Sequence, residues 1–318
     1  MRPHPAHSAG TKDQPARVLD VVSIGALASW PVLPVYTYSP SHPHSTQPCL
    51  RPRTERFPHV PSWIRTAVGI VEEIAQSQAD AIEAAAQIAA RSIADDGVVY
   101  TFGTGHSRMP VEEIFPRYGS YPGFQPLVEL SMTFHTQVVG ANGQRQAMFI
   151  ERVEGLAEQI LANFRLRPSD SMFIFSVSGL NAVPIEMAMG AKKAGLPVIA
   201  ATSLRETNAA EPRHPSGSRL ADHADVVIDL GSPVGDAICR VPGLDVPVGP
   251  VSTFTAIAVV NEIKVRVAEL LAERGAMPPV ITSSRLVGAD RSNELFEGAY
   301  LEFARRSAAA LRIADGAR

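Results

Sequence analysis

The chain has 318 residues, of which 45% are apolar, and its formal net charge is −3 at pH 7. This composition is typical of a globular protein with one large domain or two small ones. The near balance of charge gives no electrostatic reason to expect nucleic acid or an anionic membrane as a partner. No apolar run approaches the roughly 20 residues that span a bilayer.

The two cysteines, Cys49 and Cys239, lie far apart and outside any spacing typical of metal ligands. A distant pair is weak support for a disulfide, so we expect a reducing, cytoplasmic environment. The sequence also has no cluster of His, Cys and Asp with convincing metal-ligand spacing. We therefore expect neither a metal nor another cofactor.

Residues 1–61 differ from the rest of the chain, because they contain eleven prolines and five of the nine histidines. Proline interrupts helices, so this segment has little capacity to bury apolar surface and offset its ordering entropy. We interpret it as a disordered tail, or as translated upstream sequence from a wrongly chosen start codon. Metal binding by its histidines is the weaker alternative, because they lack a fixed scaffold.

Regular structure is expected from Ser62, in a domain that extends to residue 307 and is followed by a flexible tail over residues 308–318. Apolar residues recur at helical spacing from Ile64 to Ile93, which predicts one long helix. Beyond it, short apolar runs alternate with helical patterns. The predicted strands are Val98–Phe102, Leu127–Leu130, Met172–Val177, Pro197–Ala201 and Val226–Leu230, and the predicted helices are Met109–Tyr118, Arg152–Phe164, Ala182–Ala194, Thr253–Arg274 and Asn293–Arg306.

These strands are apolar throughout rather than alternating, which indicates burial on both faces. With helices between them, such strands form a parallel sheet between two helical layers. The sequence therefore predicts an α/β fold, a three-layer α/β/α sandwich.

Two turns rich in glycine and hydroxyl side chains follow predicted strands. Residues 103–107 read Gly-Thr-Gly-His-Ser, and residues 176–181 read Ser-Val-Ser-Gly-Leu-Asn. Ligands of parallel sheets bind at the carboxyl ends of the strands, where glycine allows close approach and helix N-termini present N–H donors. Each turn alone is also compatible with an ordinary tight turn, but the two together predict a phosphate site.

Neither turn matches a nucleotide-binding motif. No Gly-Lys-Ser/Thr follows, as a P-loop requires, and Arg108 stands where the dinucleotide fingerprint has its third glycine. A small phosphate compound is therefore favoured over a nucleotide.

The order of these motifs resembles the sugar isomerase (SIS) domain family, and within it the branch described only as uncharacterised SIS-domain, sugar-phosphate-binding proteins. The resemblance covers roughly Ile64 to Arg306. It rests on the two turns and on further matching segments, which are 182–188, 212–220, 235–237 and 248–253. Residues 287–291 read Val-Gly-Ala-Asp-Arg, where the family pattern has Gly-Gly-Asp-Glu-His, so the resemblance assigns no role to that loop.

The resemblance implies a flavodoxin-like, five-stranded parallel sheet in a homodimer or homotetramer that binds the phosphate of a sugar phosphate. The family role transfers most directly to Ser107, Ser176, Ser178 and Asn181. Arg213 and His214 lie in a loop whose cationic residues could close over a phosphate, or could simply be solvated. The full set of candidate binding residues is Gly103, Thr104, Gly105, Ser107, Ser176, Ser178, Gly179, Asn181, Arg213 and His214.

Sugar-phosphate chemistry needs a carboxylate or imidazole that transfers protons between neighbouring atoms. The candidates near predicted strand ends are His106, Glu112, Glu113, Glu129 and His135. Some have a structural alternative: His106 could shape its turn, and the adjacent Glu112 and Glu113 could form a solvated helix surface.

Two functions fit this sequence. The first is an isomerase, or a lyase or etherase, that acts on an amino or N-acetylated sugar phosphate by acid/base proton transfer. The second is a non-catalytic sugar-phosphate sensor that regulates a protein partner. Direct DNA binding is disfavoured, because residues 1–61 are broken by proline and are not notably basic.

Overall fold

Five short strands form the centre of the domain, of which the three inner ones are fully buried and the two at the edges are partly buried. The computed structural model describes residues 62–133 and 143–311. All neighbouring strands of this sheet are parallel, in the order β2-β1-β3-β4-β5. The strands are β1 Val99–Gly103, β2 Phe124–Leu127, β3 Ser171–Phe175, β4 Val198–Thr202 and β5 Val226–Asp229. The predicted α/β class and the flavodoxin-like, five-stranded parallel sheet are confirmed.

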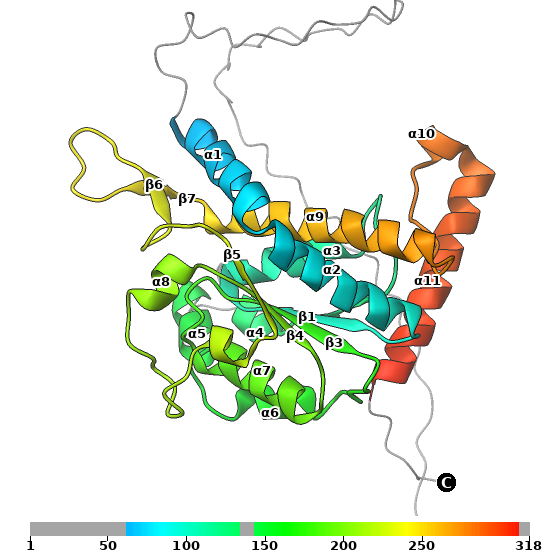
Figure 1. The fold of residues 1–318 in the computed structure, drawn as a ribbon, viewed down its shortest axis with the longest axis horizontal. Coiled ribbons are helices and arrows are strands. Elements are labelled where there is room, and N and C mark those ends of the chain that lie inside the picture. Colours follow the sequence, from blue (N-terminus) through cyan, green and yellow to red (C-terminus); the bar gives the residue numbers. More distant parts are fainter. Residues whose placement is uncertain (1–61, 134–142, 312–318) are drawn as a thin grey trace, which may run out of the picture. The chain divides into compact units, whose positions relative to one another are not determined.

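Helices cover both faces of this sheet (Figure 1). Because successive side chains of a strand point to opposite faces, Phe173 and Phe175 enter one core with α2 and α9, whereas Met172 and Ile174 enter the other with α6 and α7. The helices are α1 Ser62–Ser77, α2 Ala79–Ala94, α3 Met109–Ile114, α4 Leu130–Thr133, α5 Gly143–Ile150, α6 Leu156–Leu161, α7 Ala182–Lys193, α8 Leu204–Asn208, α9 Ser252–Glu273, α10 Ser284–Val287 and α11 Ala289–Ala310, with 3₁₀ turns at Gly105–Arg108 and Leu220–His223.

The strand order places a topological switch at β1. The chain passes from β1 to the neighbour on one side, β2, and then returns to β3 on the other side. Ligands of open parallel sheets bind outside the carboxyl ends of the strands at such a switch. The turns after β1 and β3 are the two turns with the glycines and serines.

Three helix predictions differ from the structure, and the one over 152–164 is only the short helix α6, Leu156–Leu161. The predicted helix over 64–93 is two helices, because Gln78 leaves helical geometry and its side-chain oxygen accepts a hydrogen bond from the Asp229 amide at 3.0 Å. The predicted helix Met109–Tyr118 ends at Ile114, since Phe115 is extended ahead of Pro116. A residue before proline is biased away from helical geometry.

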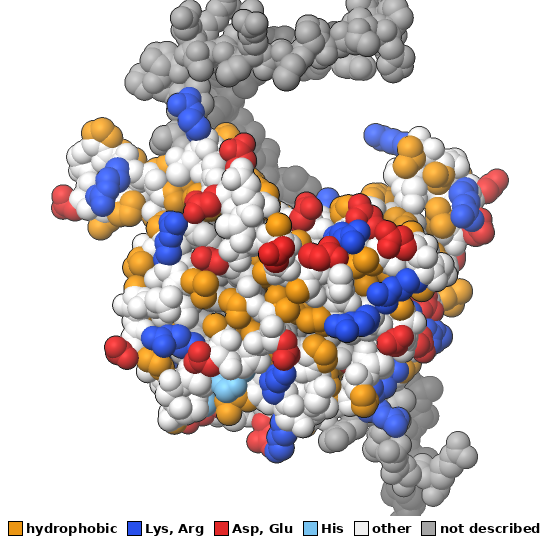
Figure 2. Space-filling model, in the orientation of Figure 1, with side chains coloured by type: hydrophobic (Ala, Val, Ile, Leu, Met, Phe, Trp, Pro, Cys, Tyr) orange, Lys and Arg blue, Asp and Glu red, His pale blue; other side chains and the backbone are white. Residues whose placement is uncertain are grey.

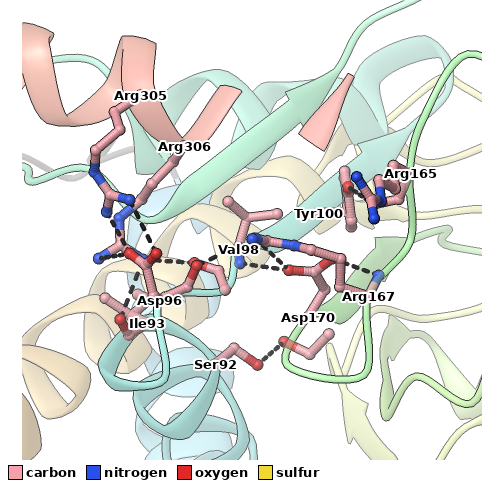
Figure 3. A network of polar contacts seen from close by, with 12 residues as sticks. Ser92, Ile93, Asp96, Val98, Tyr100, Arg165, Arg167, Asp170, Arg305 and Arg306 are labelled. Atoms are coloured by element: carbon pink, nitrogen blue, oxygen red, sulfur yellow. Dashed lines mark hydrogen bonds and ion pairs between the residues drawn. The ribbon is translucent and has the colours of Figure 1, made fainter. Parts of the chain in front are cut away.

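The C-terminal helix α11 is fastened to the loop between α2 and β1 (Figure 3). The buried Arg306 side chain donates to the carbonyl oxygens of Ile93 and Gly97, at 3.1 and 2.5 Å. Arg305 reaches the Asp96 carboxylate in the same loop. These contacts bring residues about two hundred positions apart into one polar network.

A two-stranded antiparallel arm projects from the domain beside α1 (Figure 1). This arm comprises residues 237–250, with β6 Ala237–Cys239 and β7 Val248–Pro250. The indole Nε1 of Trp63 donates to the Gly249 carbonyl at 3.1 Å, which ties the start of α1 to the arm. Within the described ranges, no helix combines the length and apolarity needed to cross a membrane.

Candidate functional site

A cavity of about 350 Å³ opens at the carboxyl ends of β1 and β3, at the switch in strand order. Eight residues of the two predicted turns line it: Thr104, Gly105, His106, Ser107, Ser176, Val177, Ser178 and Asn181. The other walls come from α5, α8, the base of the arm and the start of α9. The structure therefore brings the two turns, about seventy residues apart, into one hollow.

The turn after β1 is compact because of its glycines. A Cβ on Gly103 would lie 2.1 Å from the Ser107 carbonyl oxygen, so the turn could not fold back so closely with another residue there. Gly105 has φ +54°, in the left-handed region that favours glycine. Ser107 then follows in a 3₁₀ turn and is one of the residues that line the cavity.

The turn after β3 is held by its own serines. The hydroxyl oxygen of Ser176 accepts a hydrogen bond from the Gly179 amide at 3.2 Å, and that of Ser178 accepts from Leu180 at 3.4 Å. Gly179 has φ +61°, and a Cβ there would lie 3.0 Å from Thr202 Oγ1. The predicted binding residues Gly103 and Gly179 thus shape the turns, whereas the serines line the cavity.

Glu151, which the sequence did not single out, is the most distinctive polar group of the cavity. It lies immediately after α5. Its carboxylate accepts hydrogen bonds from Thr104 Oγ1 at 2.6 Å and from Asn181 Nδ2 at 2.8 Å. One residue from each predicted turn therefore holds this carboxyl group at the cavity wall.

The surroundings of Glu151 shift the pKa of its carboxyl group. Burial raises the pKa of the Glu151 carboxyl above its ordinary value, while the Thr104 hydrogen bond and the charges of Arg152 and Arg213 partly oppose that shift. A carboxyl with a raised pKa can both accept and donate a proton closer to neutral pH, as a general acid/base requires. Asn181 Oδ1, on the neighbouring wall, is buried and has no hydrogen-bond partner among the described residues.

Asp236 closes the far side of the cavity by capping α9. Its carboxylate accepts hydrogen bonds from the backbone amides of Val251 and Ser252, at 3.1 and 2.7 Å, and from the Ser252 hydroxyl at 2.6 Å. An acidic side chain is favourable at the N-terminus of a helix, where an external anion would otherwise bind. Since Asp236 already occupies that place, the two serine turns are the better position for a phosphate.

Glu206 stands on α8 beside the second turn. Its Oε2 accepts a hydrogen bond from the Gly235 amide at 2.8 Å, next to Asp236. The following residue, Thr207, donates from its hydroxyl to the Ser178 carbonyl at 2.8 Å, which fixes α8 against the serine turn. Glu151, Glu206 and Asp236 are thus three carboxyl groups around one cavity.

Two predicted catalytic residues lie elsewhere. Glu112 and Glu113, on α3, line a second cavity of about 590 Å³ with Tyr118, Phe296 and Tyr300. Glu112 pairs with Arg108, and Glu113 pairs with Arg117 and accepts a hydrogen bond from Asn261 at 3.0 Å. Burial alone would raise the pKa of the Glu113 carboxyl, but the contacts with Asn261 and Arg117 lower it overall. The charged form of Glu113 is therefore stabilised.

Among the predicted site residues that the structure describes, Glu129, Arg213 and His214 are absent from the lining of the first cavity. Glu129 follows the end of β2 by two residues, and His135 lies outside the described residues. Arg213 is exposed, although its charge is felt by Glu151. His214 contacts Ser216 Oγ through Nδ1 at 2.7 Å and Glu186 Oε1 through Nε2 at 3.4 Å. The predicted roles of these residues stay predictions.

The sequence contained a clue to four further residues of the cavity wall, which are Asp236, Pro250, Ser252 and Thr253. They belong to the segments 235–237 and 248–253, which carried part of the family resemblance but were not included among the candidate site residues. Within the described ranges, the structure holds no group of three or more His, Cys, Asp or Glu side chains arranged to bind a metal ion.

Comparisons with known proteins find relatives of this chain. A family model described as SIS domain matches residues 62–203. A UPF0309 protein of Listeria monocytogenes serotype 4b is 33% identical over 241 residues, covering 76% of this chain and 95% of that protein. A UPF0309 protein of Streptomyces coelicolor is 33% identical over 233 residues, covering 73% of this chain and 90% of that protein.

Two solved structures are similar to this chain at lower sequence identity. Phosphoheptose isomerase GmhA from Neisseria gonorrhoeae is 15% identical, with a TM-score of 0.44, over 66% of this chain and 97% of that one. The sugar isomerase domain of an RpiR transcription factor from Sphaerobacter thermophilus is 16% identical, with a TM-score of 0.36, over 75% of this chain and 97% of that one.

Proposed function

This chain belongs to the sugar isomerase (SIS) domain family, within its UPF0309 group, and we propose that it binds a sugar phosphate and moves protons along the sugar's carbon chain. One observation carries this proposal. Glu151 lines a single cavity together with Ser107, Ser176 and Ser178. A phosphate anchor and an acid/base group are thereby within reach of one small ligand.

The phosphate is assigned to the two serine turns. Ser107, Ser176 and Ser178 supply hydroxyl donors, and the chain enters α7 directly after the second turn, so the positive end of that helix dipole faces the same place. The α9 N-terminus is already capped by Asp236. The sugar carbons then extend from the serine turns toward Glu151.

Glu151 is assigned as the principal acid/base group. In an isomerisation, its carboxylate takes a proton from the hydroxyl-bearing carbon beside the carbonyl while the carbonyl oxygen gains a proton, which gives an enediol. The carboxyl group then returns its proton to the former carbonyl carbon, while the hydroxyl on the first carbon loses its proton and becomes the new carbonyl. In an elimination, it takes the same kind of proton while the bond from the next carbon to a leaving oxygen breaks, and a second group protonates that oxygen. His106, at the cavity wall, is the candidate for the second group.

The experiment is solvent-deuterium exchange into a panel of sugar phosphates, followed by NMR, with wild-type protein and Glu151→Gln. We expect wild type to label one carbon of at least one compound, and the variant to lose at least about 100-fold in rate. Because Gln keeps the shape and one acceptor, the affinity of the variant for the same compound should stay within about threefold.

The matched control is Glu158→Gln, an exposed glutamate of α6 outside the cavity, which should exchange at the wild-type rate. Equal rates of deuterium exchange in Glu151→Gln and wild type would show that Glu151 is not the acid/base group. Binding of the panel without any exchange would instead favour the second candidate function.

That second candidate is a non-catalytic sensor, and the exposed apolar side chains of the arm favour it. Leu244 and Val246 of the arm are 53% and 66% exposed. Figure 2 shows hydrophobic side chains on the surface of the arm. Asp236, just before the arm, and Pro250, at its end, line the cavity. A ligand that moved these residues would alter the surface offered to a protein partner. Pull-down with and without sugar phosphate tests this function, and identical partners in both conditions would oppose it. The expected homodimer or homotetramer stays a prediction.

A further inference from the structure

We propose that α1, α9 and the groove between them form an interface with a second copy of this chain. The two copies are related by a two-fold axis, so that α1 of each lies against the groove of the other. Among the described residues, this groove and the cavity at the carboxyl ends of β1 and β3 have no lining residue in common. The interface is therefore independent of the proposed function.

Helix α1 has an apolar side that its own domain leaves uncovered. Ala67 and Ile74 pack into the domain and are almost fully buried. A second row of apolar side chains is partly or fully exposed and recurs every three or four residues; it consists of Ile64, Val68, Val71 and Ala75. Ile64 is 59% exposed and Val68 is 43% exposed. Residues at this spacing share one face of a helix, so α1 carries an uncovered apolar stripe beside its buried side.

Helix α9 carries a similar stripe. Phe254, Ala258 and Val265 are partly or fully exposed and follow one another at intervals of four and seven residues, with Asn261 completing the row. Phe254 is 40% exposed and Val265 is 57% exposed. The other side of α9 is buried in the core of the domain. A helix that is apolar on more than one side is typically covered on each of them, so this stripe indicates a further contact.

A groove of about 320 Å³ joins the two stripes, because both contribute to its lining. Val71 and Ala75 come from α1, and Ala258 comes from α9, which lies alongside α1 and α2 (Figure 1). The buried side chains of Ile82 and Val259 also line it. An apolar helix face laid into an apolar groove is a recurring mode of recognition. This surface has both parts, the stripe and the groove, and is thus self-complementary, as a two-fold interface requires.

Two unpaired charges of opposite sign accompany this surface. Arg65 lies on α1 next to the first residue of the stripe, and Glu262 of α9 lines the groove; both are exposed. Within the described ranges, neither side chain forms an ion pair or a hydrogen bond. The other charged residues of the groove, Glu83 and Arg266, bind each other at 2.6 Å. A second copy can pair its Arg65 with this Glu262, and opposite charges across an interface fix its orientation.

The uncovered apolar area is sufficient for a stable dimer. Such an interface buries about 800 Å² of each partner, of which slightly more than half is apolar. The two stripes together expose on the order of 400 Å² of apolar surface, so they and the polar side chains around them supply this area. A second copy is the occupant that these features favour, because the stripe, the groove and both charges belong to the same chain.

The test is sedimentation velocity of the full chain at about 10 µM. We expect wild type to have twice the mass of one chain. Val68→Arg should raise the dissociation constant at least about 100-fold and sediment as a monomer, because it places a charge in the middle of the apolar stripe. The exposed position of Val68 allows arginine without disturbing the core. Leu286→Arg, at an 80% exposed leucine of α10, is the matched control and should stay dimeric.

A charge exchange tests the two-fold arrangement. Arg65→Glu and Glu262→Arg should each raise the dissociation constant at least about tenfold, and the double variant should return to within about threefold of wild type. Thermal melting verifies that every variant is folded. A monomeric wild type would overturn the interface, as would a dimer that Val68→Arg leaves intact. Two weakened single variants without recovery in the double variant would overturn the pairing of Arg65 with Glu262. The proposed function stands after any of these results.

Discussion

At the residue scale, the contact between Thr104 and Glu151 sets the pH at which the site can act. The hydroxyl donates to the charged carboxylate at 2.6 Å, which lowers the pKa of Glu151, while burial raises it more. Removing the donor leaves burial less opposed, so the pKa should rise further. A base works only when it is ionised, and its rate therefore increases as pH rises through its pKa.

We predict that Thr104→Val shifts the rising limb of the pH–rate profile for deuterium exchange toward alkaline pH, by about 0.5–1 unit. Valine keeps the shape of threonine but has no hydroxyl. Ser178→Ala, in the other turn, is the control. It should weaken binding of the sugar phosphate but leave the rising limb of the pH–rate profile at nearly the same pH. A Thr104→Val profile that moves to lower pH, or not at all, would contradict the assignment.

The sequence allowed the two turns to be predicted, because their chemistry is local. Glycines that permit positive φ and serines after apolar strands can be recognised within a few residues, as with Gly105 and Gly179. Glu151 could not be found in this way, since it reaches the cavity only when the chain before β3 folds over both turns. Its neighbours fit an amphipathic helix pattern, in which a single glutamate carries no signal.

At the element scale, α9 depends on an acidic cap from the base of the arm. Asp236 has φ +65°, a conformation that costs energy for a non-glycine residue, and its three hydrogen bonds offset that cost. We predict that Asp236→Ala lowers the free energy of unfolding by about 1–2 kcal/mol in urea titration, because the helix loses its cap.

Asp236→Asn provides the comparison, since asparagine tolerates positive φ and retains one acceptor oxygen. Its loss should be less than half of that in the alanine variant. Equal stability of the alanine variant and wild type would mean that the cap contributes nothing to the domain.

Element boundaries were predicted less well than element types, for reasons visible in single residues. The strand expected at 127–130 is β2, Phe124–Leu127, with Pro126 inside it. Proline usually argues against a strand, but β2 is the edge of the sheet, where a missing N–H is tolerated. The break at Gln78 likewise comes from a contact with Asp229, 151 positions away, which no local pattern encodes.

At the scale of the whole molecule, α11 closes the domain through one buried arginine. Arg306 binds the Ile93 and Gly97 carbonyls and the Glu302 carboxylate, at 2.7 Å from its Nε, whereas the neighbouring Arg305 makes exposed ion pairs (Figure 3). We predict that Arg306→Ala lowers the free energy of unfolding by about 2–4 kcal/mol, because buried acceptors lose their partner.

Arg305→Ala is the matched control and should cost less than about 1 kcal/mol, as is usual for exposed ion pairs. Hydrogen exchange of the α11 amides gives a second readout, in which faster exchange is expected only in the Arg306 variant. Similar losses in the two variants would place the anchoring of α11 elsewhere.

The central claim is that one cavity, between the turns after β1 and β3, holds the phosphate and the reacting carbons of a sugar phosphate. A crystal structure of Glu151→Gln with a bound sugar phosphate tests it most directly, because the variant should bind without turnover. We predict phosphate oxygens within hydrogen-bond distance of the Ser107, Ser176 and Ser178 hydroxyls, and the side chain of residue 151 within about 4 Å of a sugar carbon. A phosphate bound instead beside Glu112 and Glu113 in the second cavity, or residue 151 turned away from the sugar, would contradict the account.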